Sequence, residues 1–271
     1  MKFTLDSNVW EKVTNPEDYC YDNLFGLYKE LQGLIIKHNE HSYWLSMSVF
    51  SQEEIEREYR LKSWKKAEPK FKSSIKDTQD GICMSLIFGP DDSIFEIKEI
   101  DSDDYRNHRE ILYKHAKKAF DMGFKVIDLP IVGVPFDKEF VNGHRETCTD
   151  DIATKAQEVD DFVREELKTG QLELEELLEK YGIPKVDLFS GIKKLPYNDK
   201  VVKEFSKAMA EWGDANAIIE HISHGGDYFV TSDYAKGAGS KSIMSSQNVI
   251  RLEQKYGFKK INPHELRDIL K

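Results

Sequence analysis

The stretch HGGDYFVTSD, His224 to Asp233, ends a helical pattern with two glycines, continues with three apolar, β-prone residues and finishes in Thr-Ser-Asp. A short apolar run of this kind is typical of a buried strand. A similar strand opens the chain, where residues 2–5 are followed directly by Asp6. Because ligands gather at the carboxyl ends of parallel strands, Asp6 and Asp233 predict a site at one edge of a sheet.

Outward from this strand, the last quarter of the chain alternates helices and strands. We expect helices over 200–212 and from Asp214, a strand over 228–231, a helix over 249–256, a strand over 258–261 and a last helix opened by Asn262 and Pro263. This alternation predicts a parallel sheet with helices on its faces.

The first three quarters are less regular. After a turn at residues 6–8, we expect helices over 22–37 and 52–66, strands over 83–87 and 94–100, a helix over 105–122, irregular chain over 126–135 and one or two solvent-facing helices over 149–181. The helical segments follow from apolar residues at three- and four-residue spacing, and the strands from alternation.

Composition limits the class of protein. The 271 residues carry a formal net charge of −10, 32% are charged and 39% are hydrophobic, which predicts a folded globular chain. The first residues lack the features of a signal peptide, no apolar run could span a membrane, and the three cysteines are far apart, so we expect a cytoplasmic protein. The acidity argues weakly against nucleic-acid binding, although a basic footprint can be local.

A single acid after a strand is often only a helix N-cap. Here two strands end in this way, at Asp6 and Asp233, and Asp214 stands in the opening turn of the helix expected before the second. Three acids directed to one edge favour a cluster. Asp227 precedes its strand instead, so we expect it to have a capping or turn role. We expect His221 and His224 to lie at the surface or to interact with the C-terminal dipole of their helix.

The same residues carry a resemblance to a family. FTLDSNV, Phe3 to Val9, resembles the opening strand and Asp-Thr-Asn-Val signature of PIN-domain nucleases. Gly213-Asp214-Ala215 and the strand ending in Thr-Ser-Asp are similar to the closing half of that family, and residues 257–266 to its last strand and Pro-Glu-Leu helix. The resemblance implies an α/β fold, a PIN-like three-layer sandwich around a parallel sheet.

The resemblance also implies an acid on an early helix after a Ser-rich second strand. The segment SMSVFSQEEI, residues 46–55, fits that place, and Glu54 is favoured over Glu53 because it precedes an aliphatic residue. The alternative is that both glutamates only complement the positive end of a helix capped by Ser51.

Crowded carboxylates repel one another unless a cation neutralises them, and oxygen-only ligands select Mg²⁺ or Mn²⁺. The implied catalytic and metal-binding residues are therefore Asp6, Glu54, Asp214 and Asp233. Asn8 and Thr231 would hold the loops by hydrogen bonds. After Asp233 the family often has a further acid, but this chain reads Tyr-Ala-Lys-Gly over 234–237, which puts a two-ion site in doubt.

A basic run, residues 57–76, holds eight Lys or Arg against two Glu. Its cations predict contacts with an RNA backbone, and its aromatics Trp64 and Phe71 could stack on bases. The cations assigned to RNA are Arg57, Arg60, Lys62, Lys65 and Lys66. The alternative is an exposed helix and linker whose aromatics belong to the core.

We therefore expect a PIN-like domain in two parts, 1–60 and 199–271, separated by a large mixed, mainly helical central insertion, 61–198. The expected function is a divalent-metal-dependent endoribonuclease, a toxin or defence effector, with RNA and an antitoxin-like inhibitor as partners, no membrane, and homodimerisation left open. The alternative function is a catalytically inactive PIN-like module that binds RNA or protein.

Overall fold

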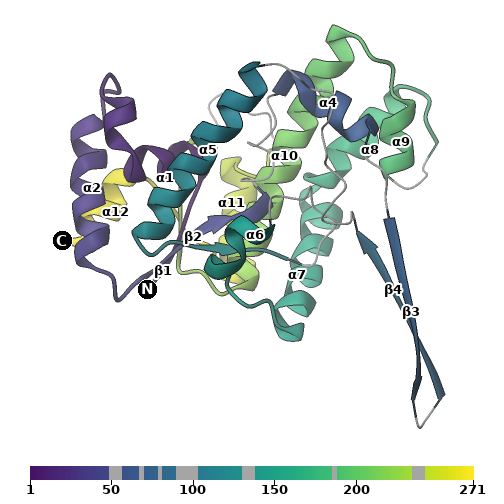
Figure 1. Cartoon of the computed structure of the whole chain (residues 1–271), viewed down its shortest axis with the longest axis horizontal. Helices are drawn as coiled ribbons and strands as arrows, with labels where there is room; N and C mark the ends of the chain where they lie inside the picture. Colours follow the sequence, from purple (N-terminus) through teal and green to yellow (C-terminus); the bar gives the residue numbers. More distant parts are fainter. Residues whose placement is uncertain are drawn as a thin grey trace.

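The computed structural model describes residues 1–48, 57–66, 70–78, 81–89, 103–129, 138–184, 188–233 and 242–271. Within these ranges the central element is a five-stranded sheet in the order β5-β2-β1-β6-β7 (Figure 1). Its strands are β1 (Lys2–Leu5), β2 (Ser42–Ser46), β5 (Lys125–Ile127), β6 (Tyr228–Val230) and β7 (Lys260–Ile261). All four pairings are parallel, so the carboxyl ends of the five strands lie at one edge.

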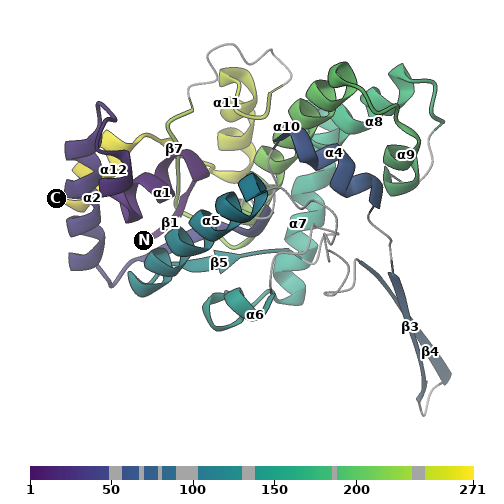
Figure 2. The same cartoon turned by 45° about the horizontal axis from the view of Figure 1, so that its top comes forward.

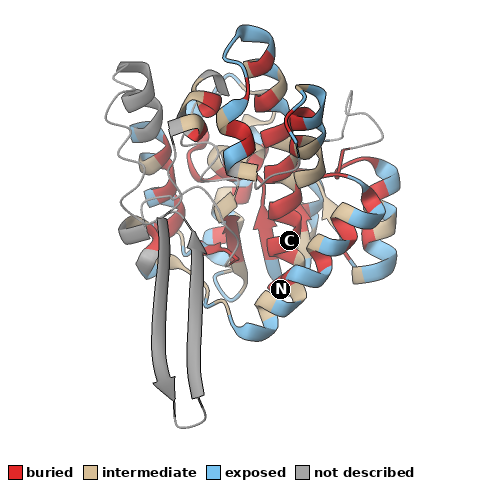
Figure 3. Ribbon diagram, turned by 90° about the vertical axis from the view of Figure 1, so that its right-hand side faces the viewer, coloured by how far each residue is buried: buried red, intermediate tan, exposed pale blue. Residues whose placement is uncertain are grey.

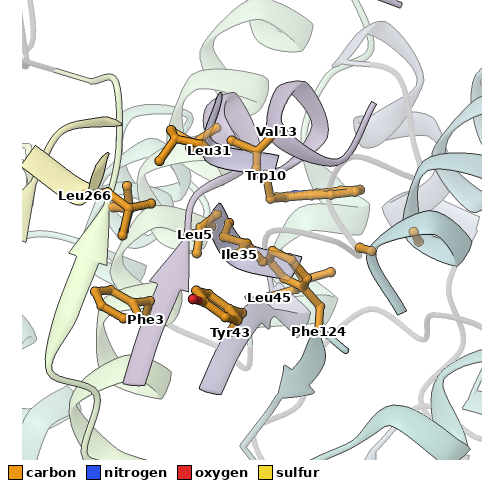
Figure 4. Close-up of a cluster of buried hydrophobic side chains, with 14 of the residues drawn as sticks. Phe3, Leu5, Trp10, Val13, Leu31, Ile35, Tyr43, Leu45, Phe124 and Leu266 are labelled. Atoms are coloured by element: carbon orange, nitrogen blue, oxygen red, sulfur yellow. The ribbon is translucent and has the colours of Figure 1, made fainter. Parts of the chain in front are cut away.

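Helices cover both faces of the sheet, because successive strand residues alternate in direction. Phe3 and Leu5 of β1 point to one face, where they pack with side chains of α1 (Ser7–Thr14), α2 (Phe25–Lys37), α5 (Asp103–Asp121) and α12 (Pro263–Leu270) (Figure 4). Thr4 points to the opposite face and contacts α10 (Asp199–Ser223). The expected α/β class with a parallel sheet between helical layers is confirmed.

The second face is covered by three helices. Phe229 of β6 packs with side chains from α7 (Asp150–Phe162), α10 and α11 (Ser246–Tyr256). In Figure 3 the buried positions, coloured red, gather in the interior of the molecule, and the exposed positions, coloured pale blue, lie on the outer side of the ribbon. Helices thus exclude water from both faces of the sheet, which agrees with the apolar sequences of its strands.

A third apolar cluster extends the molecule beyond the sheet. It joins the first half of α10 to α4 (Arg57–Lys66), α8 (Gln171–Lys180) and α9 (Leu188–Lys194) (Figure 2). The rings of Trp64 in α4 and Trp212 in α10 have their centroids 5.8 Å apart. The remaining helical segments of the described residues are Pro16–Tyr19, α6 (Lys138–Val141), Asn142–His144 and the π-helical Val163–Leu167.

The expectation of two helices on either side of Gly213 is wrong, since α10 is one helix of 25 residues. A glycine inside a helix costs about 1 kcal/mol relative to alanine. Here the residues around Gly213 are buried between two apolar clusters, with Trp212 in one and Ala215 in the other, and this burial outweighs the cost. Asp214 therefore lies inside a helix and does not open one.

The irregular chain expected over 126–135 is wrong for residues 126 and 127, since β5 begins at Lys125 and pairs with β2, and residues 130–135 lie outside the described residues. Only three residues long, β5 has no alternation that could predict it, and pairing and burial in the first cluster define it. β5 and part of α5, which fall inside the expected insertion 61–198, belong to the sheet and to its first core cluster.

Residues 70–78 form a strand, where the alternative for the basic run 57–76 had a linker after the helix. This strand, β3 (Lys70–Thr78), pairs antiparallel with β4 (Gly81–Gly89), which contains the strand expected over 83–87. The two form a ribbon that stands apart from the five-stranded sheet in both views (Figures 1 and 2). The strand expected over 94–100 lies outside the described residues.

The ends of the sheet agree closely with the expectations. β1, β6 and β7 fall within the predicted strands, and α12 begins after Asn262 with a capping box that Glu265 completes. Asp6 does not stand in a plain turn but caps α1. Among the described helices, none combines the length and the apolar character that crossing a membrane requires.

Candidate metal centre at the carboxyl edge of the sheet

Asp6 lies between the end of β1 and the start of α1, with only 8% of its surface exposed. Its Oδ1 accepts a hydrogen bond from the Ser7 N–H at 2.7 Å. Its Oδ2 accepts bonds from the Asn8 amide at 2.8 Å and from the Thr231 hydroxyl at 2.6 Å. Three donors from two strand ends therefore fix the orientation of this carboxylate.

The same hydrogen bonds join β1 to β6. The Ser232 N–H donates to Asn8 Oδ1 at 2.9 Å, and the Asp233 N–H donates to Thr231 Oγ1 at 2.9 Å. Asn8 and Thr231 thus hold the two strand ends together and leave the side chain of Asp233 in solvent. The ending Thr-Ser-Asp therefore has a structural reason. Thr231 binds the carboxylate of Asp6, and Asp233 follows two residues later at the carboxyl edge of the sheet.

The two acids act on each other electrostatically. Burial raises the pKa of Asp6 above its usual value, the hydrogen bonds from Thr231 and Ser7 oppose this, and the nearby Asp233 carboxylate raises that pKa further. Burial also lowers the pKa of Lys260 on β7, whose Nζ is 3.5 Å from the Asp233 carbonyl. A cation beside Asp6 and Asp233 would stabilise the ionised form of both.

Asp214 is half-buried in α10. His221, seven residues later, lies on the same stripe of the helix and its Nδ1 is 2.8 Å from Thr4 Oγ1. α10 runs antiparallel to β1, because Lys2 Nζ reaches the His224 carbonyl at 3.2 Å. Asp214 is thus about 10 Å beyond the level of Thr4 and Asp6 about 7 Å beyond it, at the same end of the sheet.

Glu54 lies outside the described residues, as do Ser51, Glu53 and residues 234–237. After β2 the described residues continue as far as Ser48, and Glu54 lies six residues further along the sequence. The predicted fourth acid therefore stays a prediction from the sequence.

The structure shows a further acid that sequence reasoning missed. Glu220 of α10 is 2% exposed, and its carboxylate accepts hydrogen bonds from the hydroxyls of Ser46 and Ser48, both at 2.5 Å. Burial raises the pKa of Glu220 to about 8; the two serine hydrogen bonds oppose the rise and Asp128 adds to it. The signal was present in the sequence, since an acid between Ile219 and Ile222 interrupts the apolar face of a helix.

Asp128 directly follows β5, as Asp6 follows β1. Its carboxylate forms a salt bridge with Arg145. Four acids thus lie at one edge of the sheet, beside four neighbouring strands: Asp128 after β5, Glu220 of α10 bound to Ser46 of β2, Asp6 after β1 and Asp233 after β6.

The expected surface position of the two histidines is wrong. His221 is fully buried and His224 is 7% exposed. Burial lowers the pKa of His221 to about 3, so its ring is neutral, and it packs edge-on against Phe229 and Phe258. Asp227 has the expected local role, since its carboxylate accepts the Lys2 N–H at 2.8 Å.

The basic run is partly structural. Trp64 is 2% exposed and belongs to the third cluster, which supports the alternative that this aromatic is core. Arg60 is also buried, and Lys65 Nζ donates to the carbonyls of Lys193 and Leu195 at the end of α9. Lys62 is half-buried, and the side chains of Arg57, Lys66 and Phe71 lie outside the described residues.

The donor set suits a hard divalent cation. Asp6, Asp233, Asn8 and Thr231 offer carboxylate, amide and hydroxyl oxygens, with no thiol or imidazole among them. In Asp6, Oδ2 accepts two hydrogen bonds, whereas Oδ1 accepts the Ser7 N–H bond at 2.7 Å and keeps a lone pair for a metal. The residues described at this edge therefore fit Mg²⁺ or Mn²⁺ better than Zn²⁺.

The assignment of a function rests on the site itself, because the comparisons with known proteins give no match. No protein-family model matches the chain, and neither the curated proteins nor the solved structures contain a match.

Proposed function

We propose that this chain is a PIN-like, divalent-metal-dependent ribonuclease whose centre is built on Asp6 and Asp233. The observation that carries the proposal is the buried carboxylate of Asp6, held by Ser7, Asn8 and Thr231 beside a second acid at the carboxyl edge. The sheet supports the PIN-like part of the proposal, because all its strands are parallel and β1, which ends at Asp6, is the middle strand of the five.

Each residue has a distinct part in the proposed reaction. Asp6 and Asp233 bind the ion, with Asp214 from α10 and Glu54 completing the set or orienting the attacking water. Asn8 and Thr231 position Asp6 through the bonds described above. When bound, the ion polarises the scissile phosphate and lowers the pKa of an attacking water.

Lys260 places a cation at this edge, beside the carbonyl of Asp233. In the proposed function it attracts the phosphate backbone of the substrate. Arg60 and Lys65 are assigned to packing instead. An antitoxin-like inhibitor would act by covering the edge that holds Asp6 and Asp233, and the cytoplasm is its proposed setting.

Cleavage of mixed RNA and DNA substrates tests the proposal, with Mn²⁺, Mg²⁺ or EDTA. The wild type should cleave RNA only with metal, and Asp6→Asn, Asp214→Asn and Asp233→Asn should each lose most activity. Asp227→Asn is the matched control, because this carboxylate binds the Lys2 N–H at the other edge of the sheet.

A second readout separates metal binding from cleavage. Mn²⁺ should raise the melting temperature of the wild type and of Asp227→Asn, but not that of Asp6→Asn, because binding to the folded state alone stabilises it. Equal behaviour of all variants, with no cleavage and no metal-dependent shift, would reject the nuclease and favour the inactive binding module.

A further inference from the structure

A second group of ligand-type side chains lies at the opposite edge of the sheet. His38 caps the C-terminus of α2, and the His41 N–H donates to the His38 carbonyl at 3.2 Å, which closes a turn over residues 38–41 before β2 begins. A turn of this kind brings its first and fourth residues together. The two imidazole rings accordingly stack, with centroids 6.0 Å apart and planes inclined by 16°.

Glu40 places its carboxylate between the two rings. Its Oε1 is 3.1 Å from His38 Nδ1 and 3.8 Å from His41 Nε2. One ligand atom from each of the three residues lies within 4.8 Å of the others. Tetrahedral ligands about 2.0–2.1 Å from a zinc ion are roughly 3.3 Å apart, so small rotations of the side chains would suffice.

The surroundings hold the two rings in place. His41 packs against Phe3 and Tyr43, with ring centroids 5.9 Å and 6.5 Å away, and the Tyr43 hydroxyl donates to the His38 carbonyl at 3.2 Å. The side chains of His38 and His41 are 25% and 15% exposed, whereas that of Glu40 is 58% exposed. The two imidazole rings are thus held in position by their neighbours, and an ion can reach them from the solvent side.

The donors select a different ion from the one proposed at Asp6. Two imidazole nitrogens with one carboxylate favour borderline ions such as Zn²⁺, Co²⁺ or Ni²⁺, whereas Mg²⁺ prefers oxygen ligands alone. Hydrogen bonds from its own backbone N–H and from His38 lower the pKa of Glu40, so its carboxylate is ionised at neutral pH.

We infer that His38, Glu40 and His41 form a binding site for a zinc-class divalent ion, with its remaining coordination position open to water. The site is separate from the proposed nuclease centre, because it precedes β2 whereas Asp6 follows the parallel strand β1. A bound ion ties the end of α2 to the start of β2 and stabilises the folded chain.

Zinc titration of the EDTA-treated full chain tests this inference, followed by calorimetry and by melting temperature. The wild type should bind one Zn²⁺ here and melt at a higher temperature. Glu40→Gln and His38→Ala should weaken binding at least about tenfold, as expected when one of three ligands is lost. Asn39→Ala, at an exposed position of the same turn, should bind as the wild type does.

Co²⁺ provides a spectroscopic check, since its visible absorption reports tetrahedral nitrogen and oxygen ligands. The absorption should appear in the wild type and in Asp6→Asn, and should be lost in Glu40→Gln. Because Asp6→Asn removes the proposed nuclease centre, the two proposals can fail separately. Zinc affinity unchanged in both Glu40→Gln and His38→Ala would overturn the site, as would the absence of zinc binding by the wild type.

Discussion

The hydroxyl of Thr231 donates a 2.6 Å hydrogen bond to Oδ2 of Asp6, and this contact joins the carboxyl ends of β1 and β6. The same hydroxyl oxygen accepts the Asp233 N–H. One side chain therefore sets the positions of both acids, although they are 227 residues apart in the sequence.

Thr231→Val is expected to impair metal-dependent cleavage by about 10–100-fold, because it removes a group that orients a ligand. Valine keeps the shape and the β-branched form of threonine, so the strand should still form. Thr231→Ser keeps the hydroxyl and is the matched control. Cleavage rates measured over a Mn²⁺ titration check this, and equal rates for Thr231→Val and wild type would contradict the positioning role.

Glu220 predicts a pH-dependent stability. Its pKa is about 8 in the folded chain and near its ordinary value of 4.5 when unfolded, so the folded state holds one proton more between these values. Stability then falls with rising pH, by at most about 1.4 kcal/mol per pH unit from this group. The loss begins above pH 4.5 and is complete only above pH 8.

Glu220→Gln should remove this slope, since an amide does not titrate, and its oxygen can accept from one serine hydroxyl while its NH2 group donates to the other. The check is urea unfolding of wild type and variant at pH 5, 6, 7 and 8. The variant should gain stability relative to the wild type at each step. The difference between the two proteins cancels the effect of His221, whose lowered pKa acts with the opposite sign up to about pH 6.5. A constant difference would contradict the prediction.

The strand ends were predictable because their signals are local. An apolar run followed by Asp, or by Thr-Ser-Asp, is visible within ten residues, and the capping box at Asn262 within four. The identity of β1, β6 and α12 therefore needed no knowledge of distant parts of the chain.

The other features of the carboxyl edge of the sheet depend on contacts between residues that are far apart in the sequence. β5 is a strand because Val126 pairs with Leu45, and three residues cannot signal this alone. Glu220 belongs to the edge because α10 brings it to Ser46, 174 residues away. The continuity of α10 across Gly213 likewise follows from burial on both sides of the glycine, which the sequence pattern does not reveal.

Gly226 is predicted to tolerate no side chain. A Cβ built on it would lie 2.2 Å from the ring of His221, which is itself enclosed by Phe229 and Phe258. Gly226→Ala should destabilise the protein by about 1–3 kcal/mol, as for overpacked cores. Gly33→Ala in α2 is the control, because no atom lies within 4 Å of its Cβ, and it should stabilise the helix by about 0.5–1 kcal/mol. Urea unfolding measures both, and equal effects would show that the His221 ring can move aside.

Substitutions of Trp64 distinguish between a role of this residue in the core and a role in binding nucleic acid. Its ring is 2% exposed and packs against Trp212, so Trp64→Ala should cost about 3–5 kcal/mol of stability, as for large core aromatics. Trp64→Phe keeps most of the packing and should lose much less. If Trp64 stacked on bases, both variants would bind single-stranded RNA more weakly at a temperature where each remains folded. We expect their RNA affinity in EDTA to equal that of the wild type, as measured by fluorescence anisotropy with circular dichroism to verify folding. Weaker binding by a folded Trp64→Phe would show that the ring leaves the cluster to contact RNA.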